Sequence, residues 1–277
     1  MTGEKERCSR IYRYVSPYPG ECCYSILARC RVYSGYSTSR FIYELTGTLR
    51  RLDRFLFMPF PYASSDISAF EIERAVNRHS CLPYTAPILD EEDLNLVRKL
   101  MSESVLSTGE QKRLTRHTGV THWRKQFLCY CPLCVELDRE QYGETYWHLI
   151  HQIPGVWMCP DHDVKIKESD IAVNSTRFEL IPAEYAIHSL SQMQIQKETN
   201  TLLTLISTES QWLLENGFKI PLSVRKMILS DVFLSKKEEL VLAYNLSDIE
   251  DCSHADIVWL ILFLNCQGKR ISTMDFY

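Results

Sequence analysis

The sequence predicts a mainly α-helical protein with a central module of short strands. Apolar residues recur at three- and four-residue steps towards both ends of the chain, which is the periodicity of helices. Over residues 119–170 this spacing fades, and aromatic, proline, cysteine and histidine residues gather instead. We therefore expect a helical N-terminal domain over residues 1–118, a central module over 119–180 and a helical C-terminal domain over 181–277.

Near the N-terminus the pattern predicts two short helices joined by a tight turn. Residues 20–34 carry one apolar face, and Gly35 ends the first helix. Ser37, Thr38 or Ser39 can cap the second, which contains Phe41, Ile42 and Leu45 before Gly47. Such a pair is a helix-turn-helix candidate, although two simply packed helices give the same pattern. The basic residues that could reach phosphate from it are Arg40, Arg50, Arg51 and Arg54.

Further helices are expected along the rest of the chain. One covers residues 66–80, and another begins at the acidic run 90–93, because acidic side chains favour a helix N-terminus. A third runs from Leu202 to Gly217, and others follow Pro221, Ser235 and Ser253. The last is apolar on every side over residues 257–264, which predicts burial inside the chain or against a partner or a second copy.

Charge and composition exclude several classes of protein. The net charge is −4, so the whole molecule lacks the basic footprint of a protein that coats nucleic acid. Residues 1–60 nevertheless hold ten Lys and Arg against five Asp and Glu, which fits either a local nucleic-acid contact or a solvated basic face. The polar first ten residues predict no export signal, and the longest apolar run, 257–264, is too short to span a membrane. We expect a cytoplasmic protein.

Two short ligand pairs in the central module predict a metal site. Cys131 and Cys134 form a Cys-x-x-Cys pair, Cys159 and His162 form a Cys-x-x-His pair, and 24 residues separate the two pairs. Three thiolates and one imidazole complete a tetrahedral zinc shell, which favours structural over catalytic zinc. His148 and His151 could also face one another and bind metal, but we favour backbone or carboxylate partners for both.

The eleven cysteines are therefore not expected to form a disulfide framework. In a reducing compartment the cysteines outside the zinc set are interpreted as small buried apolar residues. The sequence contains no phosphate-binding glycine loop, nucleophile elbow or catalytic metal motif. We therefore expect that the protein is not an enzyme.

Several motifs together resemble the TniQ/TnsD family of transposon target selectors. The first runs from Pro17 through Glu21 to Arg29, and the second covers residues 79–84. The longest and most specific block begins at Tyr130 and ends at His162, and includes Asp138, the stretch 142–148 and the stretch 151–156. The resemblance covers roughly residues 15–165. Within the longest block, Leu149 stands where the family often has arginine. The C-terminal third of the chain is similar to the family only as a set of helices.

The resemblance implies an adaptor in a bacterial cytoplasm that connects a target-recognition device to an AAA+ (TnsC-like) regulator, which recruits the transposase. In short-tailed members the device is often an RNA-guided CRISPR effector such as Cascade or a type V effector, with DNA and guide RNA nearby, and some members form homodimers. It also implies that Cys131, Cys134, Cys159 and His162 are the zinc ligands. The alternative is an autonomous sequence-specific DNA-binding selector that uses residues 20–54 and 221–250 as helix-turn-helix units.

Overall fold

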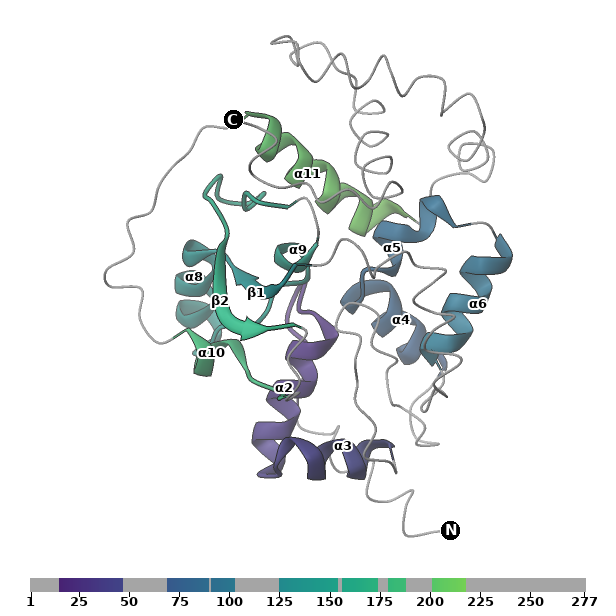
Figure 1. Cartoon of the computed structure of the whole chain (residues 1–277), viewed down its shortest axis with the longest axis vertical. Helices are drawn as coiled ribbons and strands as arrows, with labels where there is room; N and C mark the ends of the chain where they lie inside the picture. The colour runs from purple at the N-terminus through teal and green to yellow at the C-terminus, as the bar shows by residue number, and fades with distance from the viewer. Residues whose placement is uncertain are drawn as a thin grey trace.

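The computed structural model describes residues 15–46, 69–89, 91–102, 125–153, 156–173, 179–187 and 201–217. Within these ranges the protein is mainly helical, with one small sheet, as the sequence predicts (Figure 1). The predicted helices after Pro221, Ser235 and Ser253, the apolar segment 257–264 and the region 221–250 lie outside the described residues. So do Gly47 and the basic residues Arg50, Arg51 and Arg54.

The two predicted N-terminal helices are present. Helix α2 (Cys23–Ser34) ends at Gly35, which adopts the left-handed conformation (φ 68°) that glycine tolerates best. Helix α3 (Thr38–Thr46) follows after a short turn and crosses the end of α2 (Figure 1). The Ser37 hydroxyl accepts a hydrogen bond from the Arg40 backbone N–H at 3.3 Å, so Ser37 is the residue that caps α3.

The next helices lie together on the right-hand side of Figure 1. Helix α4 (Ala69–His79) is followed at once by the single-turn helix α5 (Leu82–Thr85) and the 3-10 helix η1 (Ala86–Ile88). Helix α6 (Glu91–Ser102) begins with three acidic residues, as predicted, and packs against α4. Its apolar face, formed by Leu94, Val97 and Met101, is buried.

The central module contains the described sheet. Strand β1 (Phe127–Tyr130) pairs antiparallel with β2 (Lys167–Ala172) in a register that sets Tyr130 opposite Lys167. The pairing shifts between Phe127 and Cys129, so the ladder is irregular on that side. The module also holds α8 (Pro132–Tyr142) and the one-turn helix α9 (Leu149–Gln152), although helical spacing fades in this region of the sequence.

The last described helices close the fold around this module. Helix α10 (Ala183–Ala186) lies beside β2, and α11 (Thr201–Asn216) runs across α9 and α5 (Figure 1). Gly217, just past α11, lies so close to α5 that an added Cβ would sit 1.8 Å from the Pro83 carbonyl oxygen. The segment 201–217 is therefore packed directly onto the N-terminal half of the chain.

One hydrophobic cluster joins residues from all three expected ranges. It includes Leu27 and Phe41 from the N-terminal range, Trp147 from the central range and Leu213 from the C-terminal range. Trp147 is completely buried, and its indole N–H donates to the Ile181 carbonyl at 2.9 Å. Where each domain begins and ends stays a prediction, but the described elements share a core.

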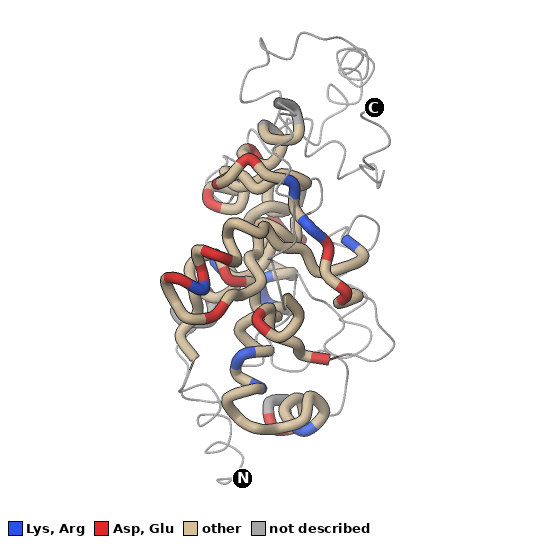
Figure 2. The backbone as a smooth tube through the Cα atoms, turned by 90° about the vertical axis from the view of Figure 1, so that its left-hand side faces the viewer, with Lys and Arg blue, Asp and Glu red and all other residues tan. Residues whose placement is uncertain are grey.

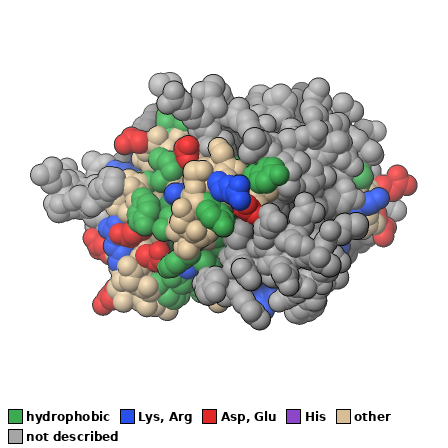
Figure 3. Space-filling model, turned by 90° about the horizontal axis from the view of Figure 1, so that it is seen from below, with side chains coloured by type: hydrophobic (Ala, Val, Ile, Leu, Met, Phe, Trp, Pro, Cys, Tyr) green, Lys and Arg blue, Asp and Glu red, His purple; other side chains and the backbone are tan. Residues whose placement is uncertain are grey.

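The described surface is mixed in charge. Along the backbone of the described residues, basic and acidic residues are scattered among the others, with no long basic stretch (Figure 2). Seen from below, apolar, basic and acidic side chains intermix over the described surface (Figure 3). Among the described helices, none combines the length and the apolar character needed to cross a bilayer.

Candidate metal centre

The first ligand pair lies where β1 passes into α8. Cys131 is the N-cap residue of α8, Pro132 takes the first helical position and Cys134 lies in the first turn. The Val135 N–H donates to the Cys131 carbonyl at 3.1 Å and closes that turn. Both sulfurs therefore sit at the positive end of a helix, which favours thiolates.

The second ligand pair lies in a tight turn before β2. The His162 and Asp163 N–H groups both donate to the Cys159 carbonyl, and the Cys159 N–H donates to Val164 at 2.8 Å. Asp163 has a positive φ of 52°, the left-handed conformation that reverses the chain at this point. The turn thereby brings Cys159 and His162 to the same side.

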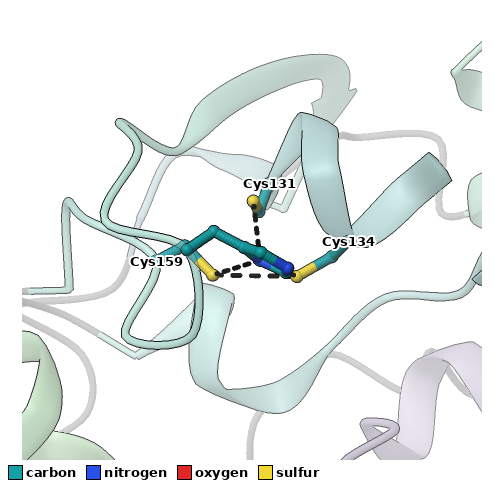
Figure 4. Close-up of side chains that lie close together, drawn as sticks. Cys131, Cys134 and Cys159 are labelled. Atoms are coloured by element: carbon teal, nitrogen blue, oxygen red, sulfur yellow. Dashed lines mark hydrogen bonds between the residues drawn. The ribbon is translucent and has the colours of Figure 1, made fainter. Parts of the chain in front are cut away.

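These two turns bring the four predicted ligands together. The sulfurs of Cys131, Cys134 and Cys159 point towards a common centre (Figure 4). His162 Nδ1 lies 3.6 Å from the Cys131 sulfur, 3.3 Å from Cys134 and 3.4 Å from Cys159. The Cys134 and Cys159 sulfurs are 3.7 Å apart. The four residues could bind a metal ion.

The distances fit one tetrahedral ion. With metal–sulfur bonds of about 2.3 Å and metal–nitrogen bonds of about 2.0 Å, tetrahedral edges are about 3.8 Å between sulfurs and about 3.5 Å between sulfur and nitrogen. The measured sulfur–sulfur edge of 3.7 Å and sulfur–nitrogen edges of 3.3–3.6 Å agree with these values. All three cysteines are buried, whereas His162 is half-buried.

The thiols also compete for negative charge. Hydrogen bonds from Cys134 and Cys159 lower the pKa of Cys131 far below its usual value. The same contact with Cys131 raises the pKa of Cys134, and it raises that of Cys159 to about 12. Without a cation, Cys131 alone would therefore be a thiolate, whereas a divalent ion would stabilise all three thiolates.

Backbone or carboxylate partners are predicted for both His148 and His151, and only His148 has one in the structure. His148 Nε2 lies 2.9 Å from a carboxylate oxygen of Asp138. His151 is buried, its Nε2 lies 3.8 Å from the Cys134 sulfur, and its Nδ1 has no hydrogen-bond partner. Burial lowers the pKa of His151 well below its usual value. Cys134, His148 and His151 also form a second group close enough for metal, which shares Cys134 with the first.

Two residues that support the metal centre, Asp138 and Gln152, have functions that the sequence does not predict. Asp138 accepts hydrogen bonds from the Thr145 hydroxyl at 2.9 Å and from His148. Gln152 exchanges side-chain hydrogen bonds with both backbone groups of Cys129, at 3.0 and 2.7 Å, and so ties α9 to β1. Asp138 follows Cys134 by four residues on α8, and this spacing places it on the ligand-bearing side of the helix.

A buried ion network joins the N-terminal motif to the metal block. The Arg29 guanidinium lies 2.8 Å from Glu21 and 2.9 Å from Glu144, and it stacks 3.8 Å from the centre of the Tyr18 ring. Glu21 is completely buried, and burial raises its pKa while Arg29 lowers it. The sequence supplies these residues within two distant motifs, and the fold brings them into contact.

Backbone contacts reinforce that network. The Leu149 N–H donates to the Gly20 carbonyl at 2.7 Å, and the Cys22 N–H donates to the Trp147 carbonyl at 3.0 Å. The Ser25 hydroxyl accepts the Trp147 N–H at 3.1 Å. The start of α2 and the segment before α9 are therefore paired almost as two strands.

Of the predicted nucleic-acid contacts, only Arg40 lies among the described residues. Its guanidinium is 55% exposed and forms an ion pair with Glu44 one turn along α3. It also lies about 6 Å from the rings of Tyr36 and Tyr43, at 6.0 and 5.9 Å. A phosphate contact by Arg40 stays a prediction.

Comparisons with known proteins agree with these motifs. The family model described as TniQ matches residues 13–166. The chain is 26% identical over 193 residues to the Transposon Tn7 transposition protein TnsD of Escherichia coli. That alignment covers 64% of this chain but only 37% of TnsD. Because the TniQ match extends over more than half of the 277 residues, the chain belongs to the TniQ family.

Proposed function

We propose that this chain is a non-catalytic adaptor for transposition target selection. It links a target-DNA-recognition complex, an RNA-guided CRISPR effector, to an AAA+ regulator that recruits the transposase. The observation that carries this proposal is membership of the TniQ family over a single packed unit, together with the likeness to a relative named as a transposition protein. Binding of the AAA+ regulator and binding of the CRISPR effector can each be tested directly.

Zinc in this proposal is structural. Cys131, Cys134, Cys159 and His162 would hold it, and it would supply the cross-link that fixes β1, α8 and the turn before β2 to one another. The four ligands fill the tetrahedral shell, so the bound ion would keep no open position for a substrate or a reacting water. Such a centre supports a rigid binding module rather than a hydrolytic site.

The charge arrangement supports a protein partner over bare DNA. A DNA-binding surface needs Lys and Arg side chains that are free to neutralise phosphates. Among the described residues, Arg29 is buried in its ion network, and Arg139 pairs with Glu184 at 2.9 Å. Lys125 is buried and donates to the His151 carbonyl at 2.8 Å. These cations stabilise the fold, which leaves fewer of them for a phosphate backbone.

The test is a reconstitution with purified components. The zinc-loaded chain is immobilised and incubated separately with the AAA+ regulator, with the CRISPR effector subunits encoded beside it, and with duplex DNA. Saturable capture of the regulator and of the effector at physiological salt is the expected result. Capture of neither, by a chain whose metal content and melting are intact, refutes the adaptor. The Cys131→Ser variant provides the misfolded control.

The second candidate is an autonomous DNA-binding target selector. The α2–α3 pair favours it, because two helices joined by a short turn carry exposed Tyr36, Arg40 and Tyr43 at one end of the molecule. This function predicts tight, sequence-dependent binding of DNA without an effector. Its affinity should fall steeply with salt, with log K changing by about 0.9 per neutralised phosphate against log salt. Substituting Arg40 by Ala should then reduce that slope by about one contact.

A further inference from the structure

His151 lies against the metal centre without belonging to its ligand set. Its Nε2 is 3.8 Å from the Cys134 sulfur, and its side chain is almost fully buried. The four residues whose donor atoms all lie close together are Cys131, Cys134, Cys159 and His162; His151 groups only with Cys134 and His148. A ligand would have to approach all three sulfurs equally, so this geometry places His151 outside the coordination shell.

The chemistry of the two partners fixes the direction of the contact. A metal-bound cysteine is a thiolate, which accepts hydrogen bonds and cannot donate one. The Nε2 atom of His151 must therefore carry the hydrogen. The other ring nitrogen, Nδ1, has no partner, which is tolerable for an acceptor lone pair and costly for a buried N–H.

We propose that His151 is an outer-sphere positioning residue of the metal centre, whose Nε2–H donates a hydrogen bond to the Cys134 thiolate. The inference rests on the metal site proposed above. Three thiolates around one divalent ion leave an excess negative charge in a buried site, and a neutral N–H dipole offsets part of it without adding a second cation. Because charge strengthens such bonds, the 3.8 Å contact should shorten when Cys134 ionises.

The surrounding structure holds the imidazole in place from both sides. His151 lies on the single turn α9, which is tied to Gly20 through Leu149 and to β1 through Gln152. Its ring lies 4.9 Å from the ring of His148, which is itself fixed by Asp138. The hydrogen bond therefore connects the metal centre to the N-terminal motif through α9.

Cobalt substitution tests this role directly. Cobalt(II) replaces zinc in the wild-type chain and in the His151→Phe, His151→Gln and His79→Phe variants. Phenylalanine keeps the ring but has no donor, whereas the glutamine amide can present an N–H near the Nε2 position. We expect His151→Phe to shift the sulfur-to-cobalt charge-transfer band to lower energy and to weaken metal retention against a chelator by about 10- to 100-fold. Glutamine should restore most of both properties.

His79→Phe is the matched control. His79 is a half-buried histidine, and its Nδ1 contacts the Glu21 carbonyl at 2.6 Å rather than a cysteine. Its replacement should lower stability and leave the cobalt band unchanged. A band and a retention equal to wild type in His151→Phe would overturn the proposal. Loss of a metal equivalent in that variant would also overturn it, by making His151 a ligand, for instance of a second ion bridged by Cys134.

Two further results keep the inference separate from the metal proposal. A wild-type chain that binds no zinc or cobalt at the cysteine centre refutes the metal site itself, whereas normal loading with unchanged variants refutes only His151. If His151→Phe fails to fold, NMR of nitrogen-labelled, zinc-loaded wild type reads the tautomer of His151. The Nε2–H form supports the proposal, and the Nδ1–H form overturns it.

Discussion

Replacing Arg29 by methionine should destabilise the fold more than any exposed charge substitution. Methionine keeps the apolar stem but removes the guanidinium that pairs with Glu21 and Glu144, at 2.8 and 2.9 Å. Glu21 is completely buried and would be left without its cation. Removing one partner of a buried pair costs about 3–5 kcal/mol, because the remaining charge has lost its solvation. For a domain of this size that corresponds to a fall of about 6–20 °C in melting temperature.

The assay is thermal unfolding in zinc-containing buffer, followed through the buried Trp147. Arg139→Met is the matched control, since Arg139 forms a similar pair with Glu184 but both side chains are about 30% exposed, at 28% and 32%. An exposed pair of this kind contributes about 0–1 kcal/mol. If the two variants lose equal stability, burial of the Arg29 network is not the source of its contribution.

The pH dependence gives the same prediction a second test. Burial raises the pKa of Glu21, and Arg29 opposes that rise, so the variant should raise the pKa further. A carboxyl whose folded pKa exceeds its unfolded value stabilises the fold most when protonated, and this contribution is lost as the pH rises through the folded pKa. The deficit of Arg29→Met should therefore shrink as the pH is lowered, and Glu21→Gln in the same chain should remove that dependence.

Three other substitutions follow from the described contacts. Cys131→Ser should abolish metal binding, measured by metal content, and the cooperative melting of the central module, measured by calorimetry. Cys129 lies two residues away and outside the cluster, so Cys129→Ser should retain both the bound metal and the cooperative melting. Gly217→Ala should cost about 1–3 kcal/mol in denaturant unfolding, because its Cβ would collide with the Pro83 backbone. Burial lowers the pKa of His79, so the stability that this group contributes is present above about pH 6.5 and is lost as the pH falls. His79→Gln should therefore make the free energy of unfolding less dependent on pH below about 6.5.

Much of the fold is local enough to be predicted from the sequence. Helix α2 ends at Gly35 because a left-handed residue is needed there, and α6 begins in its acidic run because those side chains favour a helix N-terminus. The four candidate metal ligands are predictable for a related reason, since each pair lies within four residues and its spacing reflects one turn.

The supporting network is not predictable in the same way. Arg29 meets Glu144 across 115 residues, and no periodicity reports a contact of that separation. Helix α8 is also missed, because its first turn contains Pro132 and the candidate ligand Cys134, which interrupt the apolar spacing that signals a helix. The Gln152 side chain bonds to the Cys129 backbone, and a glutamine in a sequence carries no sign of such a partner.

These long-range contacts join family motifs that lie far apart in the sequence. Glu21 precedes α2, Arg29 lies within it, and Glu144 follows α8. The ion pairs of Arg29 with the two glutamates hold the start of α2 against the segment that carries His148. A metal ion at the cysteines would fix the other end of that same segment. Apart from the bridge between Glu21 and His148, the stretch between α8 and α9 has no regular structure of its own and depends on contacts with its neighbours. The ion network and the metal centre should therefore be thermodynamically coupled, so that losing Arg29 also weakens metal retention.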